Sequence, residues 1–171
     1  MIKNLFKIDA GILQIPTINN KKLAEEVLVL PKRRSNDPTC TRYEDTYLKV
    51  HKGSESEKLI NYMTQYGEDH NMMMVDYWSQ IHHHLESTDL HVHGHIGLVD
   101  FSWVYYAKVP EKAGQLVFVL NDTDERTPIA TIEPKEGMLV IFPGYLKHKV
   151  TKNMDKETRV SISGNFKLIE R

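Results

Sequence analysis

The second half of the chain is a series of short segments with strand character, separated by turn residues. Val, Ile, Tyr, Phe and Thr are concentrated in these segments, and Gly, Pro, Asn and Asp stand between them. Spacing of this kind is typical of an all-β sandwich or barrel, and eight strands in two sheets is the number found in a jelly roll. We therefore expect a mainly β protein built on a double-stranded β-helix. The eight expected strands are 77–84, 88–93, 100–109, 115–120, 128–133, 138–142, 146–151 and 158–168.

The part of the chain before these strands has a mixed pattern with two predicted helices. Residues 20–30 carry apolar residues at helical spacing, beginning at an Asn that is suited to an N-cap. Ser54 and Glu57 have the spacing of a capping box, which predicts a second helix over residues 54–66. Gly67 is then expected to be the C′ residue that follows this helix.

The remaining N-terminal residues are expected to form strands and a loop. Residues 5–15 have the β-branched and apolar content of one or two strands, and residues 32–50 are polar enough to predict a long loop. A length of 171 residues suits one domain. We therefore predict a single domain over residues 1–171, in which an N-terminal α/β extension (1–75) packs on a jelly-roll core (77–168).

Composition and charge exclude several classes of protein. The formal net charge is −1, so no long-range field favours nucleic acid or an anionic membrane, and we expect neither as a partner. No apolar stretch approaches the roughly 20 residues of a membrane span, and the N-terminus lacks the features of a signal peptide. The single cysteine, Cys40, cannot form an internal disulfide, which favours a reducing cytoplasm.

Histidine is enriched around the second expected strand. Five of the nine histidines fall between His82 and His93. Residues i and i+2 of a strand point to the same side, so His91 and His93 would direct two imidazoles toward one point, as a metal requires. His148, at the start of a late strand, is the best candidate for a third ligand. Two close ligands and a distant histidine form the facial pattern of non-haem iron sites.

Two other ligand sets are open at this point. In an alternative register His93 and His95 bind the metal together with His148, and His91 lies outside the site. Asp100, at the start of the next strand, is a further candidate for a carboxylate ligand.

An arginine near the C-terminus suggests an anion in the same site. Arg159 begins a segment of β-branched and small residues that is expected to be a buried strand. A buried guanidinium needs an anion, and a carboxylate matches its planar geometry with two hydrogen bonds. Ser161 faces the same way as Arg159 on a strand and adds a hydroxyl donor.

The order of these pieces resembles the 2-oxoglutarate/iron(II) oxygenases, in particular their prolyl-hydroxylase-like and small phage-type members. The resemblance covers about residues 78–168, and it depends on order and spacing together. It is carried by His91-Val92-His93, Ser102-Trp103-Val104-Tyr105-Tyr106, Gly114-Gln115-Leu116-Val117-Phe118, Pro134-Lys135-Glu136-Gly137, Phe142-Pro143, His148 and Arg159-Val160-Ser161.

The resemblance implies a site and a reaction. His91, His93 and His148 would bind Fe(II), with no catalytic residue beyond these metal ligands. Arg159, helped by Ser161 and Tyr106, would bind 2-oxoglutarate. The enzyme would use O2 to hydroxylate an unidentified substrate and would release succinate and CO2. The family usually has a carboxylate where this chain has His93. Three neutral imidazoles would leave the metal more positive.

Two alternative functions remain. A cupin-type dioxygenase with three histidine ligands and no 2-oxoglutarate accounts better for His91-Val92-His93 but leaves Arg159 and Ser161 unexplained. A non-catalytic, metal-binding β-sandwich would take up no oxygen and form no succinate. The substrate and the oligomeric state are left open by the sequence.

Overall fold

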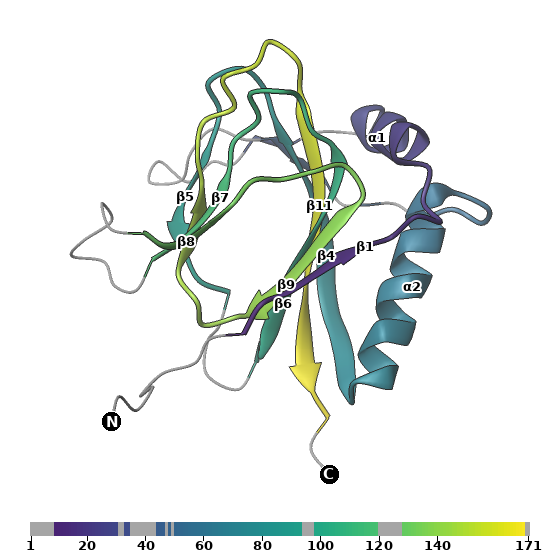
Figure 1. Cartoon of the computed structure of the whole chain (residues 1–171). Coiled ribbons are helices and arrows are strands. Elements are labelled where there is room, and N and C mark those ends of the chain that lie inside the picture. The colour runs from purple at the N-terminus through teal and green to yellow at the C-terminus, as the bar shows by residue number, and fades with distance from the viewer. Residues whose placement is uncertain are drawn as a thin grey trace, which may run out of the picture.

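All eight strands expected in the second half of the chain are present in the computed structural model (Figure 1). The structure describes residues 9–30, 33–34, 44–46, 48, 50–93, 98–119 and 128–169. Because pairing partners decide where a ladder stops, the ends of the strands differ by a few residues from those expected. The strands are β4 (Met72–His82), β5 (Thr88–His91), β6 (Phe101–Lys108), β7 (Leu116–Val119), β8 (Pro128–Ile132), β9 (Met138–Pro143), β10 (His148–Val150) and β11 (Arg159–Leu168).

The strands form two antiparallel sheets with the topology of a jelly roll. The large sheet has the order β1-β9-β6-β11-β4-β3-β2, and the small sheet has the order β5-β10-β7-β8. Strands distant in sequence are therefore neighbours, as where β11 pairs with both β4 and β6. The predicted double-stranded β-helix is confirmed.

Three further strands lie before the jelly-roll core. Of the expected segment 5–15, Gly11–Gln14 forms β1, which pairs with β9, and residues 1–8 lie outside the described part of the chain. The prediction of a continuous loop over residues 32–50 is wrong, because β2 (Arg33–Arg34) and β3 (Glu44–Thr46) fall within it. β3 pairs with β4, so the edge of the large sheet, and not the local sequence, makes this segment a strand.

Both predicted helices are present with shifted ends. α1 (Asn20–Leu28) has Asn19 as its N-cap, and the Asn19 side chain accepts a hydrogen bond from a backbone N–H in the first turn. α2 (Glu55–Asp69) starts after its predicted cap, Ser54, but continues through Gly67. The prediction of Gly67 as the C′ residue is wrong. Asn71, with φ of 55°, takes the left-handed conformation after this helix.

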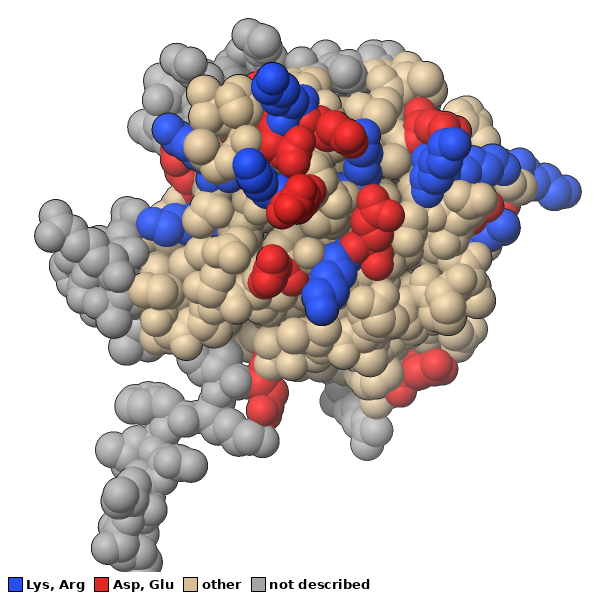
Figure 2. Space-filling model, turned by 45° about the horizontal axis from the view of Figure 1, so that its top comes forward, with Lys and Arg blue, Asp and Glu red and all other residues tan. Residues whose placement is uncertain are grey.

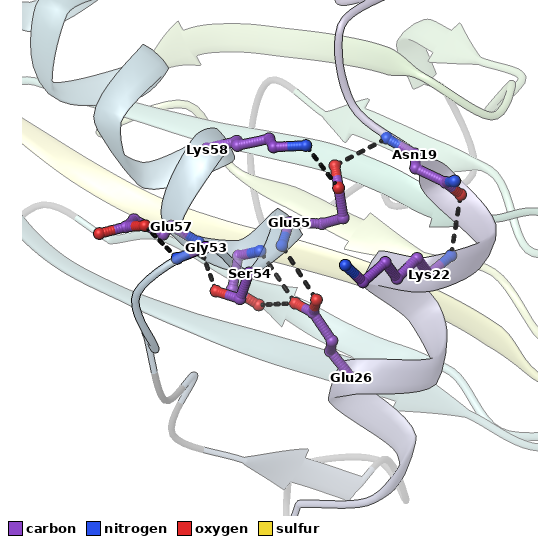
Figure 3. Close-up of polar contacts among 9 residues, drawn as sticks. Asn19, Lys22, Glu26, Gly53, Ser54, Glu55, Glu57 and Lys58 are labelled. Atoms are coloured by element: carbon purple, nitrogen blue, oxygen red, sulfur yellow. Dashed lines mark hydrogen bonds and ion pairs between the residues drawn. The ribbon is translucent and has the colours of Figure 1, made fainter.

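The two helices cap one another through their acidic side chains (Figure 3). The Glu26 carboxylate of α1 accepts hydrogen bonds from the backbone N–H groups of Glu55 and Ser56 at 2.9 and 3.0 Å. In return, the Glu55 carboxylate of α2 accepts one from the Asn19 N–H at 2.9 Å. Each carboxylate satisfies backbone donors that the start of a helix leaves unpaired, which fixes the two helices together.

Two apolar cores lie on opposite faces of the large sheet. One cluster joins α1 and α2 to the helix-facing side of β6, β9 and β11, where both helices pack in Figure 1. The other lies between the two sheets and includes Leu116, Phe118 and Phe142. The inner face of the jelly roll, between the sheets, also carries the polar side chains of the candidate functional site. No helix in the described ranges has the length and apolarity to cross a membrane.

Candidate functional site

Strand pairing brings three histidines together at one end of the small sheet. His91 ends β5 and His148 begins β10, and the two residues are direct partners in the antiparallel ladder. His93 lies two residues beyond His91, and its backbone N–H donates to the Gly144 carbonyl at 3.1 Å. The candidate ligand nitrogens of the three side chains lie within 4.8 Å of one another.

Two of the imidazole nitrogens have the spacing of adjacent ligands on one metal ion. His91 Nε2 and His93 Nε2 are 3.2 Å apart. Two nitrogens that each lie about 2.1 Å from an ion, at close to a right angle, would be about 3.0 Å apart. The His91 and His93 nitrogens therefore fit two adjacent positions on one ion, and a ring nitrogen of His148 within 4.8 Å of both is the candidate for a third.

Backbone carbonyls fix the tautomer of two of these histidines. Nδ1 of His91 lies 2.8 Å from the Asp89 carbonyl oxygen, and Nδ1 of His148 lies 2.8 Å from that of Leu146. Because a carbonyl can only accept, each Nδ1 must carry the proton and donate it. Nε2 of each ring then keeps its lone pair for a metal, which is the usual arrangement behind a metal-binding histidine.

Burial keeps all three rings neutral. It lowers the pKa of His91, lowers the pKa of His93 to about 4, and lowers the pKa of His148 well below its usual value. The nearby histidines add to the effect on His93 and His148, because each would repel a second imidazolium. Protons therefore do not compete with a metal for these nitrogens at neutral pH.

Aromatic rings surround the histidines. The Phe142 ring lies against His148 with centroids 4.7 Å apart, and the Trp78 ring lies 5.3 Å from that of His93. Trp78 and Phe142 were not among the expected site residues. Alternation along β4 puts Trp78, Gln80 and His82 on one face, which is the signal that would have found Trp78.

Arg159 is a charged residue that is almost completely buried. Its side chain is 1% exposed, and no carboxylate of the described residues pairs with it. Nη1 lies 3.1 Å from Ser161 Oγ and 3.1 Å from His82 Nδ1, whereas Nε is buried without a hydrogen-bond partner in the described part of the chain. Burial lowers the pKa of Arg159 from its usual value, which reflects the cost of the desolvated charge.

Tyr106 completes this end of the site. The Arg159 guanidinium carbon lies 5.1 Å from the centroid of the Tyr106 ring. The Tyr106 hydroxyl is buried and makes no hydrogen bond to another described residue, and burial raises its pKa. Unpaired buried donors on Arg159 and Tyr106 indicate that a polar ligand belongs beside them.

One cavity between the sheets joins the two groups. Its lining includes the three histidines and Arg159, together with Tyr106. Further polar or aromatic side chains line it between and around these residues, among them Trp78, Gln80, Thr88, Ser102 and Ser163. An anion held by Arg159 would therefore share one cavity with a metal held by the histidines.

The structure gives positions to some of the other residues considered from the sequence. His95 falls within residues 94–97, outside the described residues. The Asp100 carboxylate accepts a hydrogen bond from the Leu168 N–H at 2.7 Å, and Asp100 is not part of the histidine cluster. In the run of three histidines, His82 is fully buried beside Arg159, whereas Nδ1 of the exposed His84 contacts the Asp155 carbonyl oxygen.

Solved structures share this fold at low sequence identity. A prolyl-4-hydroxylase from Pseudomonas putida is 17% identical, with a TM-score of 0.72 over 94% of this chain and 93% of that chain. A viral collagen prolyl hydroxylase from Paramecium Bursaria Chlorella virus-1 is 13% identical, with a TM-score of 0.65 over 94% and 96%. SnoN, a non-haem α-ketoglutarate-dependent epimerase from nogalamycin biosynthesis, is 14% identical, with a TM-score of 0.70 over 93% and 76%.

A family-level match covers the part of the chain that holds the site. No curated protein matches the sequence. The family described as "Putative 2OG-Fe(II) oxygenase" matches residues 76–165, more than half of the 171 residues. This range includes the three histidines and Arg159, and the donor set found there suits the iron(II) and 2-oxoglutarate that define the family. The chain therefore belongs to the 2-oxoglutarate/iron(II) oxygenase family.

Proposed function

We propose that His91, His93 and His148 bind iron(II) through Nε2, and that Arg159, with Ser161 and Tyr106, binds the distal carboxylate of 2-oxoglutarate. The observation that carries this proposal is the buried Arg159, which lines the same cavity as the histidines and whose Nε has no partner among the described residues. A buried cation without a protein carboxylate is costly unless a ligand supplies the anion. 2-Oxoglutarate has a carboxylate at the end opposite its chelating 2-oxo acid group.

Each part of the site then has a defined role. When bound, iron(II) and 2-oxoglutarate supply the oxygen chemistry, in which the cosubstrate is converted to succinate and CO2. The histidines fix the position of the metal, and Arg159 fixes the far end of the cosubstrate. Trp78, Phe142 and the small sheet exclude water from the space between them. We propose substrate hydroxylation as the outcome, in keeping with the hydroxylases among the structures that share the fold.

The histidine at position 93 distinguishes this chain from relatives that have a carboxylate there. Three neutral ligands leave the charge of the iron uncompensated by protein, and the dianionic cosubstrate is then the main source of negative charge at the metal. We expect 2-oxoglutarate to strengthen iron binding more in this three-histidine site than in a site with a protein carboxylate.

Family membership favours this function over the two alternatives. A cupin-type dioxygenase without 2-oxoglutarate, or a metal-binding sandwich without catalysis, would leave a buried Arg159 with no anion. The epimerase among the similar structures depends on the same cosubstrate, so cofactor binding and the outcome of the reaction require separate measurements.

We also propose a cytoplasmic location and no nucleic-acid partner. The single cysteine, Cys40, is suited to a reducing compartment. On the face of the molecule shown in Figure 2, Lys and Arg are interspersed with Asp and Glu, which does not favour binding a polyanion.

Anaerobic binding of the cosubstrate tests the proposal. The chelate of iron(II) with a 2-oxo acid has a weak visible charge-transfer band, which we expect when 2-oxoglutarate is added to the iron-loaded protein. His148→Ala should weaken iron binding by more than about 100-fold, since even residues behind a metal ligand cost 10–100-fold. Arg159→Ala should keep the iron and lose affinity for 2-oxoglutarate.

One variant outside the site serves as a control, and two results would contradict the proposal. His84→Ala removes an exposed histidine outside the site and should bind iron and 2-oxoglutarate as the unmodified protein does. An iron-loaded protein that gives no band with 2-oxoglutarate would contradict the cosubstrate assignment, and a protein that binds no iron would contradict the metal site. Detection of succinate and of a product heavier by one oxygen atom would separate hydroxylation from epimerisation.

A further inference from the structure

His82, the last residue of β4, contacts Arg159 in the protein interior. We propose that His82 is a positioning residue, which orients the Arg159 guanidinium for the distal carboxylate of 2-oxoglutarate without competing for it. This inference rests on the proposed role of Arg159. His82 is 0% exposed, and its backbone is the direct ladder partner of Arg159 in the pairing of β4 with β11.

Hydrogen-bond chemistry fixes the state of the His82 ring. A guanidinium can only donate, so Arg159 Nη1, 3.1 Å away, donates to a lone pair on His82 Nδ1. The proton of the neutral ring is then on Nε2, which donates to Thr88 Oγ1 at 2.8 Å. Burial and the charge of Arg159 both lower the pKa of His82 well below its usual value, in agreement with a neutral ring.

The contacts with His82 and Ser161 leave one edge of the Arg159 guanidinium for a ligand. A guanidinium has five N–H groups, two of them on Nη1. These two are taken by His82 Nδ1 and Ser161 Oγ, both at 3.1 Å. Nε is buried and has no partner among the described residues, so the edge formed by Nε and Nη2 is left for a carboxylate with two parallel hydrogen bonds.

The chemical identity of residue 82 suits this task. An Asp or Glu there would form an ion pair with Arg159 and would compete with the carboxylate of the cosubstrate. A neutral imidazole accepts one hydrogen bond and leaves the positive charge of Arg159 available. His82 therefore holds the guanidinium in place at a smaller cost to its affinity for an anion.

His82 is itself held by both sheets. Its carbonyl oxygen accepts a hydrogen bond from Asn153 Nδ2 at 3.0 Å. Thr88, the partner of Nε2, begins β5, the strand that ends at the metal-site residue His91, and Thr88 lines the same cavity. The contact chain Arg159–His82–Thr88 thus joins the carboxylate anchor on the large sheet to β5, the strand of the small sheet that ends at His91.

Substitutions at position 82 separate the two hydrogen bonds. Asn places its Oδ1 near the position of His Nδ1 and keeps the acceptor for Arg159, whereas Gln places its terminal amide near Nε2 and keeps only the contact with Thr88. Thr88→Val removes the second contact and leaves His82 in place. Each variant is titrated anaerobically, in its iron(II) form, with 2-oxoglutarate and with pyruvate, a 2-oxo acid that lacks the distal carboxylate. Thermal unfolding confirms that each variant is folded.

The proposal predicts a pattern across variants and ligands. His82→Gln should weaken binding of 2-oxoglutarate by about tenfold or more, the usual effect of losing a hydrogen bond to a charged group, and should leave pyruvate binding unchanged. His82→Asn should stay within about threefold of the unmodified protein for both ligands, and Thr88→Val should fall between these two variants.

Three results would overturn the proposal. Equal losses for 2-oxoglutarate and pyruvate in His82→Gln would show that His82 acts on the metal or on the fold as a whole. Unchanged 2-oxoglutarate binding in folded His82→Gln would show that the contact does not orient Arg159. Failure of the unmodified protein to bind 2-oxoglutarate would refute the proposed function itself, and that result is distinct because it does not depend on any variant.

Discussion

The two faces of β11 are equally buried and chemically opposite. Val160 and Ile162, each 0% exposed, point toward the helices and join the apolar cluster there, as does Phe166. Arg159 and Ser161, also nearly fully buried, point to the other side, where Arg159 lines the cavity and Ser161 Oγ accepts a hydrogen bond from its guanidinium. A single strand with a side-chain period of two therefore separates the part of the core that stabilises the fold from the part that binds ligands.

Unpaired polar atoms show the difference between the faces. Three buried polar atoms have no partner among the described residues, and all three are on residues that line the cavity; two of them are Arg159 Nε and the Tyr106 hydroxyl. The third is Trp103 Nε1, on a side chain that belongs to the helix-facing cluster. The helix-facing side gains free energy from apolar burial, whereas the cavity side has polar groups whose hydrogen bonds a ligand would complete.

Paired substitutions on the two faces give the largest expected effect. Phe166→Ala should lower the free energy of unfolding by about 3–5 kcal/mol, because it leaves a cavity in the helix-facing core. Arg159→Leu should change it by less than about 2 kcal/mol in the absence of ligand, because the lost hydrogen bonds are offset by removal of a desolvated charge. Urea unfolding of the metal-free proteins measures both values.

Ligand binding should reverse the order of these two variants. Phe166→Ala, under conditions where it is folded, should bind 2-oxoglutarate close to normally, whereas Arg159→Leu should lose that binding. The division between the faces is wrong if Arg159→Leu destabilises the protein as much as Phe166→Ala does.

The sequence predicted features that depend on local pattern. Alternation and turn residues predicted the eight strands of the jelly roll, and the same alternation placed His91 and His93 on one side. The arginine was predicted to be buried because β-branched and small residues follow it on its strand. These inferences succeed because a strand has a fixed period, which needs no knowledge of distant contacts.

The features that were missed depend on residues far apart in the chain. Gly67 looked like a helix end, but it lies inside α2, where close packing accounts for the glycine: an added Cβ would sit 2.8 Å from the Met72 carbonyl oxygen and 3.0 Å from the Phe166 ring. β3 is a strand because its backbone pairs with that of β4, which is distant in the sequence. His82 contacts Arg159 through the register of β4 and β11, which no local pattern reveals.

The pH dependence of stability should also differ between the two faces. Histidine in an unfolded chain titrates near pH 6.5, whereas burial lowers the pKa of His93 to about 4 and lowers those of His91 and His148. Between these values the unfolded chain binds more protons than the folded protein, so the free energy of unfolding falls as pH falls from 6.5 toward 4. His93 alone should contribute about 1.4 kcal/mol per pH unit in this window.

Variants on each face test the origin of this pH dependence. Urea midpoints of the metal-free protein at pH 7, 6 and 5 should decrease steadily. Phe166→Ala should shift all midpoints down in parallel, because it changes no titrating group. His93→Gln should flatten the dependence, and an unchanged slope in this variant would mean that other groups cause it.

The smallest expected effect comes from one hydroxyl on the cavity face of β11. Ser161→Ala removes one of the two acceptors that hold Arg159 Nη1, while His82 Nδ1 keeps the other. We expect 2-oxoglutarate to bind about 3–10-fold more weakly and iron to bind unchanged, because a single hydrogen bond is lost and the metal ligands are untouched. Ser163→Ala is the matched control, since Ser163 lies on the same face without a hydrogen bond to Arg159. If both alanine variants weakened 2-oxoglutarate binding equally, the effect would belong to the polarity of the cavity wall and not to the orientation of Arg159.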